Sequence, residues 1–218
     1  MKILFVKILL VTATQEESGS IDSVQKLRRI FPELEILITG IGMVKATSSL
    51  AFAIYNKKPD FILHTGICGS FNKLYPIGTV LNVLSEEFAD IGHNDNGKFV
   101  PLPEKDQPFD NGKLKNSMNW GKILKLPSVK GITVNTVNGE KSAIDKVVQQ
   151  FQPDIESMEG AAIAYLCLKL DISYAEIRAV SNFVEQRNVK NWNIPLAVKN
   201  LTTMIPEILN KILSHYGA

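Results

Sequence analysis

The chain has 218 residues, 45% of them hydrophobic and 8% aromatic, which suffices for one sizeable core and predicts a single domain over residues 1–218. Its formal net charge is +2, from 24 basic and 22 acidic residues, and neither sign forms a long block, which argues against nucleic acid or a membrane surface as a partner. Two cysteines in unrelated contexts, Cys68 and Cys167, indicate neither a disulfide framework nor a zinc site, so we expect a cytoplasmic protein without a metal.

Apolar runs of strand length alternate with helical patterns along the chain. The runs are continuous and rich in Ile, Val, Leu and Phe, which predicts strands covered on both faces at residues 8–12, 35–39, 61–65, 80–84, 131–135 and 175–180. Residues 1–11 read as a short lead-in and the buried first strand, not as a membrane span. Helical patterns cover 43–55, 142–151, 157–170 and 194–213, with Ser157 as the expected N-cap of the third. This order predicts an α/β fold.

The segment 92–128 differs from the rest of the chain. It is rich in Asn, Asp, Pro, Lys and Gly and has little hydrophobic periodicity. We interpret it as a surface excursion with poor local order and not as a linker between domains.

Polar and glycine-containing strings follow several of the predicted strands. Glu17 lies beyond the first strand, Gly40-Ile41-Gly42 and Gly66-Ile67-Cys68-Gly69 are read as turns after the second and third, and Ser181-Asn182 follows the last. In an open α/β sheet, ligands bind beyond the carboxyl ends of the strands. We therefore expect Glu17, these glycine turns, Glu159 and Asn182 to face one site.

The same strings, in the same order, resemble those of nucleoside phosphorylases and nucleosidases of the purine nucleoside phosphorylase type. They are Ala13-Thr14-x-x-Glu17, Thr39-Gly40-Ile41-Gly42, Thr65-Gly66-x-x-Gly69, Met158-Glu159-Gly160-Ala161-Ala162 and Arg178-Ala179-Val180-Ser181-Asn182. The resemblance covers nearly the whole chain. It implies a three-layer fold whose central, mostly parallel mixed sheet is flanked by helices, a purine nucleoside substrate, no cofactor, and a homodimer or larger homo-oligomer.

Shorter strings narrow the resemblance within that superfamily. Ser85-Glu86-Glu87-Phe88-Ala89-Asp90, Thr133-Val134-Asn135-Thr136-Val137 and Ser181-Asn182-x-Val184-x-x-Arg187 with Trp192 look most like those of the futalosine hydrolases. These nucleosidases of menaquinone biosynthesis release hypoxanthine and dehypoxanthine futalosine. The resemblance therefore implies hydrolysis of an N-ribosidic bond.

Glu159 and Glu17 are the candidate catalytic carboxylates. The resemblance implies that Glu159 contacts the ribose 2′- and 3′-hydroxyls, because two carboxylate oxygens match two vicinal donors, and a helix N-terminus would help keep the group ionised. It implies that Glu17 is the general base for the attacking water, and the alignment selects Glu17 over its neighbour Glu16. Each glutamate also has a structural explanation, as a first-turn residue that satisfies a helix dipole or as a solvated residue at a helix start.

Asn182 is the most discriminating residue of the pattern. In adenine-specific nucleosidases the resemblance places an Asp here, whereas an amide donates to a 6-oxo group and accepts from a protonated N7. That pattern matches hypoxanthine or guanine and opposes adenine. We expect Ser181 to orient Asn182 and Arg178 to be an internal ion-pair partner. A strand-end Asn that caps a turn is the structural alternative.

Phosphate binding decides between a hydrolase and a phosphorylase. The first loop, Ala13 to Glu17, contains no glycine, and His64-Thr65 stands where a phosphate-binding Arg is expected. Inorganic phosphate needs charge-assisted donors, so water is the better nucleophile.

Other residues are expected to complete the pocket. Met158 packs on the sugar face, Ile41, Gly69 and Val137 form walls, and Phe183 and Trp192 close over the substrate, although each aromatic also fits a core position. Arg187 is the first candidate for a carboxylate on the 5′ substituent. Lys45, Lys98 and Lys190 are alternatives to it, and residues 88–93 are candidates for completing a neighbouring subunit's pocket.

Two other classes remain open. Gly40-Ile41-Gly42 superficially resembles a dinucleotide fingerprint, but the next strand ends in His64-Thr65 and lacks the acidic ribose ligand. A non-catalytic nucleoside-binding protein on the same fold is the other alternative, and the presence of both Glu17 and Glu159 argues against it. His64 reads as a buried strand-end residue, and the three histidines show no metal-ligand spacing.

Overall fold

The computed structural model describes residues 6–96, 98–101 and 113–216. The lead-in predicted at residues 1–5 and residues 102–112 of the predicted surface excursion lie outside the described residues. Within the described part, no helix combines the length and the apolar character needed to cross a membrane.

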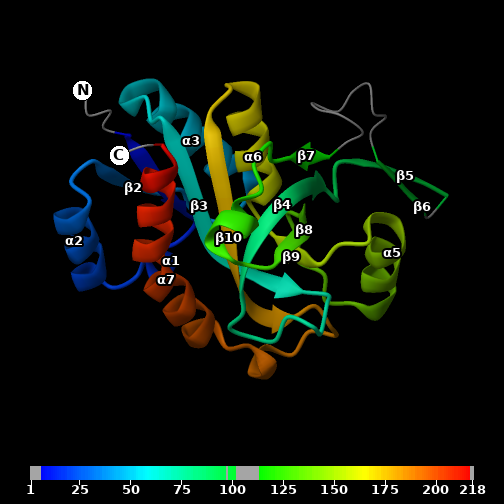
Figure 1. Ribbon diagram of the computed structural model, residues 1–218. Coiled ribbons are helices and arrows are strands. Elements are labelled where there is room, and N and C mark those ends of the chain that lie inside the picture. Colours follow the sequence, from blue (N-terminus) through cyan, green and yellow to red (C-terminus); the bar gives the residue numbers. More distant parts are fainter. Residues whose placement is uncertain (1–5, 97, 102–112, 217–218) are drawn as a thin grey trace.

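A mixed sheet organises the chain (Figure 1). Its strands are β1 (Ile8–Thr12), β2 (Leu34–Ile38), β3 (Phe61–Ser70), β4 (Val80–Phe88), β7 (Leu114–Lys115), β8 (Ser128–Thr133), β9 (Ile155–Ser157) and β10 (Ser173–Phe183). Five pairings are parallel (β1–β2, β1–β3, β3–β10, β4–β8 and β8–β9), whereas β4–β10, β3–β9 and β4–β7 are antiparallel. Because β10 pairs with both β3 and β4, and β9 joins β3 to β8, these strands close into a ring. The predicted α/β fold with a mostly parallel mixed sheet is confirmed.

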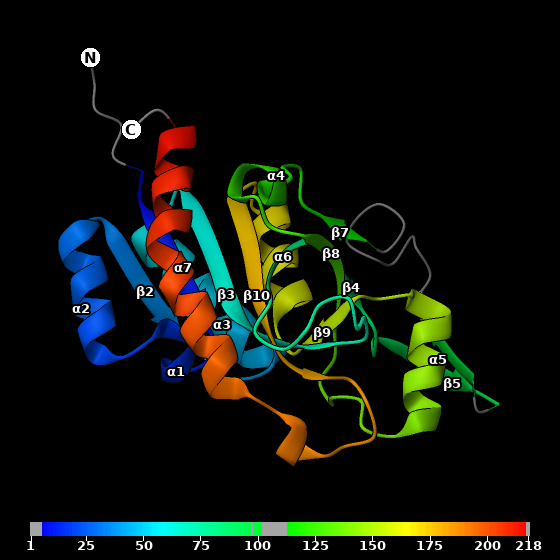
Figure 2. The same cartoon turned by 60° about the horizontal axis from the view of Figure 1, so that its bottom comes forward.

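Helices cover both faces of the sheet and create two main cores. They are α1 (Gln15–Ser18), α2 (Ile21–Ile30), α3 (Met43–Lys57), α4 (Trp120–Leu124), α5 (Lys141–Phe151), α6 (Gly160–Lys169) and α7 (Ile194–His215). Alternate residues of β1 point to opposite faces, so Leu10 packs with α2 and α7 while Leu9 packs with α3 and α6. Figure 2 shows α7 in front of the sheet. The three-layer arrangement predicted from the resemblance follows from this two-sided burial.

The third strand is longer than predicted. β3 continues through Gly66 and Gly69, which we expected to form a turn, and its register with β10 extends to Ser70 opposite Phe183. The glycines serve close packing instead, because a methyl group at Gly66 would overlap the Arg178 guanidinium. Ser181 and Asn182 likewise lie inside β10, at a bulge in its pairing with β3, and not in a loop after it.

The segment 92–128 is more ordered than predicted. It contains a hairpin of β5 (Gly92–Asp95) and β6 (Lys98–Pro101), the short β7 and the helix α4. Trp120 in α4 is fully buried and packs edge-on against Phe61 with ring centroids 5.1 Å apart. The polar composition hid this anchor, because one aromatic side chain fixes a segment without creating any periodicity.

Two further boundaries differ from the sequence prediction. β8 ends at Thr133, so residues 134–138 form a loop rather than the end of a strand. Residues 155–157 form β9, because Ile155 and Glu156 pair with β3, and the helix predicted from residue 157 starts at Gly160. Glu159 is its N-cap residue, although the backbone N–H of Gly160 donates to the Ser157 hydroxyl over 3.1 Å.

Candidate active site

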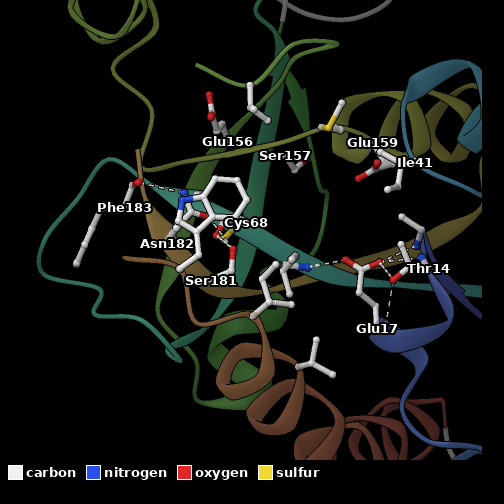
Figure 3. Close-up of a pocket in the computed structure, with 18 of the residues that line it drawn as sticks. Thr14, Glu17, Ile41, Cys68, Glu156, Ser157, Glu159, Ser181, Asn182 and Phe183 are labelled. Atoms are coloured by element: carbon white, nitrogen blue, oxygen red, sulfur yellow. Dashed lines mark hydrogen bonds between the residues drawn. The ribbon is translucent and has the colours of Figure 1, made fainter. Parts of the chain in front are cut away.

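A cavity of about 530 Å³ opens at the ends of the sheet strands. All eleven residues predicted for the site line it: Glu17, Ile41, Gly69, Val137, Met158, Glu159, Ser181, Asn182, Phe183, Arg187 and Trp192. Figure 3 shows the two predicted catalytic carboxylates toward one end and Asn182 toward the other. The fold therefore gathers side chains that are up to 175 positions apart in the chain, from Glu17 to Trp192.

Glu17 is held by a dense set of donors at the start of α1. Its Oε2 accepts from the backbone N–H groups of Ala13 (3.1 Å) and Thr14 (2.9 Å) and from the Thr14 hydroxyl (3.3 Å). Its Oε1 accepts from the backbone N–H of Ile67 over 2.9 Å. The Thr14 side chain accepts in turn from the Glu17 N–H, which completes a capping box. Glu17 is only 5% exposed, so it is a fixed wall of the cavity and not the solvated helix-start residue of the alternative explanation.

Glu159 contacts both a glycine turn and a buried arginine. Its Oε1 accepts from the backbone N–H of Gly42 over 2.8 Å, and its Oε2 lies 3.7 Å from Arg178 Nη1. Gly42 adopts φ +97°, a conformation that favours glycine, and this turn aims its N–H at the carboxylate. Burial raises the pKa of Glu159, and Arg178 and the Gly42 N–H oppose that shift. The expected help from the helix N-terminus is therefore outweighed by desolvation.

Arg178 links the cavity to a buried charge network, as predicted. Its Nε donates to Glu176 Oε1 over 2.8 Å, and its Nη2 lies 3.0 Å from His64 Nε2. His64 is buried within β3, not at a strand end, and burial followed by the Arg178 charge lowers its pKa well below the usual value. A neutral His64 leaves Arg178 as the cation beneath Glu159, which holds that carboxylate in place.

Asn182 has a defined amide orientation at the other end. The Ser181 hydroxyl contacts Asn182 Oδ1 at 2.8 Å and also lies 3.0 Å from the Cys68 carbonyl oxygen. Asn182 Nδ2 donates to the Phe183 carbonyl over 3.0 Å. Because that carbonyl can only accept, it fixes which side of the amide faces it. One N–H of Nδ2 and one acceptor site of Oδ1 remain for a ligand, so Ser181 and Phe183 orient the group.

Comparison with protein families identifies the fold around this cavity. The model of the phosphorylase superfamily matches residues 33–210, which include Glu159 and Asn182. The chain belongs to the phosphorylase superfamily.

Individual members of the superfamily show similar chains. A 5′-methylthioadenosine/S-adenosylhomocysteine nucleosidase of Buchnera aphidicola is 28% identical over 84% of this chain and 81% of its own. A futalosine hydrolase of Acidothermus cellulolyticus is 27% identical over 90% of this chain and 87% of its own. The structure of the Helicobacter pylori futalosine hydrolase matches with a TM-score of 0.79 at 16% identity, covering 95% and 98% of the two chains. This superfamily member is accordingly an N-glycosidic hydrolase.

Among the described residues, the outer wall of the cavity contains one cationic side chain and two aromatic side chains. Arg187 lies with its guanidinium carbon 5.1 Å from the centre of the Trp192 ring, and Phe183 lines the same region. Arg187 is exposed and is the cationic side chain among the described lining residues. Lys45, Lys98 and Lys190, the alternatives to it, are not among these lining residues.

Glu156 and Asn138 are lining residues to which the sequence analysis gave no role. Asn138 donates to both oxygens of Glu156, from its backbone N–H to Oε1 (3.2 Å) and from Nδ2 to Oε2 (2.7 Å). Burial raises the pKa of Glu156 to about 7 against these two hydrogen bonds. The available signal was the residue type alone, because no strand was predicted at residues 155–157 and a carboxyl group requires a partner only where the fold buries it.

Proposed function

We propose that the protein hydrolyses the N-ribosidic bond of a 5′-modified 6-oxopurine nucleoside, with futalosine as the substrate. The products are hypoxanthine and dehypoxanthine futalosine, and the reaction belongs to menaquinone biosynthesis. The orientation of the Asn182 amide is the observation that carries this proposal. The free N–H of Nδ2 donates to the 6-oxo oxygen, and Oδ1 accepts from a protonated N7.

The proposed mechanism assigns one role to each end of the cavity. Glu159 accepts hydrogen bonds from the ribose hydroxyls and stabilises positive charge that develops on the sugar. Glu17 Oε1 retains an acceptor site beside its bond from Ile67, and it takes a proton from water as the water oxygen bonds to C1′. The C1′–N9 bond breaks and its electron pair goes to N9, while N7 takes a proton from solvent, so that the base leaves as neutral hypoxanthine with its N7–H held by Asn182 Oδ1.

The charges at the end of the cavity proposed to bind the sugar favour water over phosphate as the nucleophile. Glu17 and Glu159 are both acidic, and the Arg178 guanidinium that faces them is already shared with Glu176. A phosphate dianion needs free cationic or backbone donors. Arg187, at the outer wall, suits the carboxylate of the 5′ substituent better, because its planar guanidinium binds carboxylates with two parallel hydrogen bonds.

We propose that the enzyme acts as a homo-oligomer, and the exposed apolar side chains on the outer surface of α3 support this. Val44, Phe52 and Tyr55 on this helix are 80%, 73% and 80% exposed, and Ile41, a cavity-lining residue, is 54% exposed beside them. A cluster of large exposed apolar side chains marks an interaction surface. Its continuity with the cavity is consistent with a second subunit that completes the pocket, for which residues 88–93 remain the candidates.

Base release tests the proposal directly. Futalosine, inosine and methylthioadenosine are each incubated with the enzyme, with and without phosphate, and the free base is quantified by chromatography. Hypoxanthine release from futalosine without phosphate is expected. Phosphate dependence would instead indicate a phosphorylase. Adenine release would favour the activity named for the Buchnera relative, and binding without release would favour the non-catalytic alternative.

Asn182→Asp is the variant that tests the base assignment. An ionised or protonated Asp matches the donors and acceptors of adenine better than the amide does. We expect the preference to move toward methylthioadenosine, measured as the ratio of the two kcat/KM values. An unchanged ratio would contradict the role of Asn182.

A further inference from the structure

Glu156 is a buried carboxyl group in the cavity for which the proposed mechanism has no use. It lies on β9, directly opposite Gly69 of β3 in an antiparallel pair. Asn182 lies opposite the same Gly69 in the parallel pair between β10 and β3. Glycine at this position lets both side chains lie close to β3, beside Val184, whose Cγ2 would be 2.8 Å from an added methyl group. A methyl group there would lie 3.2 Å from Asn182 Nδ2 and 3.5 Å from Glu156 Cγ.

The shared neighbour places Glu156 at the base end of the cavity. Figure 3 shows Glu156 and Asn182 toward one side, with Glu159 and Glu17 toward the other. The sugar end therefore has its own carboxylates, and Glu156 faces the part of the ligand that Asn182 faces. In a 6-oxopurine, N1–H is the ring position next to the 6-oxo carbon, so its acceptor must lie beside the donor to the oxo group.

We propose that Glu156 accepts a hydrogen bond from N1–H of the purine and, together with Asn182, selects 6-oxopurines over 6-aminopurines. This inference rests on the proposed function and adds the recognition of a second edge of the base. Asn138 is the positioning residue, because its two N–H groups hold one oxygen each and leave further acceptor sites on the carboxylate.

Adenine is rejected by the same geometry. Adenine N1 carries no proton and is itself an acceptor. An ionised Glu156 and this N1 would therefore face each other as two acceptors without a proton between them, in a largely buried site. A site built around one hydrogen-bond pattern discriminates strongly against the opposite pattern. The raised pKa of Glu156, about 7, leaves the carboxylate ionised above neutrality and allows N1–H to stabilise that form further.

Glu156→Gln is the discriminating variant, because an amide can turn to accept from N1–H or to donate to an adenine N1. The kcat/KM values are measured for futalosine and for its 6-amino counterpart. We expect kcat/KM for futalosine to fall about 10- to 100-fold, the usual scale for losing a charge-assisted hydrogen bond, and kcat/KM for the 6-amino compound to rise. Glu140→Gln is the matched control, since Glu140 is exposed and adjoins the same loop without lining the cavity.

The outcomes separate this inference from the proposed function. If the wild-type enzyme releases no hypoxanthine from futalosine, the proposed function fails first. If it does, but Glu156→Gln lowers kcat/KM equally for both nucleosides or changes neither, Glu156 has only a structural role or none, and the inference is wrong. Asn138→Asp tests the support independently: a second carboxyl group next to Glu156 should reduce the same substrate ratio, and an unchanged ratio would contradict the positioning role.

Discussion

Replacing Glu17 with glutamine tests the proposed general base through two separate quantities. The carboxylate accepts from three donors on Oε2 and from the Ile67 N–H on Oε1. The single oxygen of glutamine best replaces Oε2, which turns the amide nitrogen toward the Ile67 N–H. One buried donor then lacks an acceptor, and this costs about 1–3 kcal/mol. For a chain of this length the corresponding fall in Tm is about 2–12 °C.

The catalytic effect should be much larger than the folding effect. A positioned base contributes about 10²- to 10⁴-fold to the rate, so kcat of Glu17→Gln is expected to fall at least about 100-fold while the substrate Kd changes little. Thermal unfolding, steady-state kinetics and equilibrium binding measure the three quantities. Glu16→Gln is the control, because Glu16 is the neighbouring carboxylate and is exposed at the rim of the same cavity; substitutions of exposed residues shift the free energy of unfolding by about 0.5 kcal/mol or less. A kcat for Glu17→Gln within about twofold of wild type would refute the base, and an unchanged Tm would refute the hydrogen-bond reasoning.

Three further predictions address the charge network, the packing of β3 and pH. Arg178→Met removes the cation between Glu176 and Glu159 and should destabilise the fold by about 3–5 kcal/mol, measured by urea unfolding; a loss below about 1 kcal/mol would show that these carboxyls need no counter-charge. Gly66→Ala introduces a methyl group that overlaps Arg178 Nη1 and lies 3.0 Å from Glu17 Oε1. Overpacking of about 1–3 kcal/mol should lower Tm, and displacement of Glu17 should lower kcat. Normal kinetics would mean that the position of Glu17 does not depend on this strand. The preference for 6-oxopurines should weaken as pH falls through about 7, where Glu156 becomes protonated and can donate to an adenine N1. A preference that does not change with pH would contradict that assignment, and so would the same pH dependence in the Glu156→Gln variant.

The sequence by itself determined the class of fold and indicated eleven of the residues that line the cavity. Continuous apolar runs predicted the strands, and helical patterns identified α3, α5, α6 and α7 close to their observed bounds. Burial on both faces was wrong for β2, which lies at the end of the strand order and is partly exposed. The strings around Glu17, Glu159 and Asn182 indicated which side chains share a cavity, because residues that follow parallel strands meet at one edge. All eleven predicted lining residues are present there.

Tertiary structure alone decided where strands end and what the glycines do. The pattern placed Gly66 and Gly69 in a turn, yet both lie inside β3, since pairing with β10 continues past them. The side chain of Arg178 occupies the space beside Gly66, and those of Val184 and Asn182 occupy the space beside Gly69. Local sequence does not contain that information, because Arg178 is 112 positions from Gly66. The same holds for Trp120, whose burial against Phe61 anchors a polar segment.

The role proposed for Glu156 also depended on the fold. In the sequence it is a glutamate three residues before Glu159, and nothing in its spacing indicates a ligand. Pairing of β9 with β3 brings it to the Gly69 position that Asn182 also faces, and burial raises its pKa toward neutrality. The amino-acid sequence determines which chemical groups are available, whereas the register between distant strands decides which of them meet, because paired residues of β3 and β10 are as many as 113 positions apart, as Gly69 and Asn182 are.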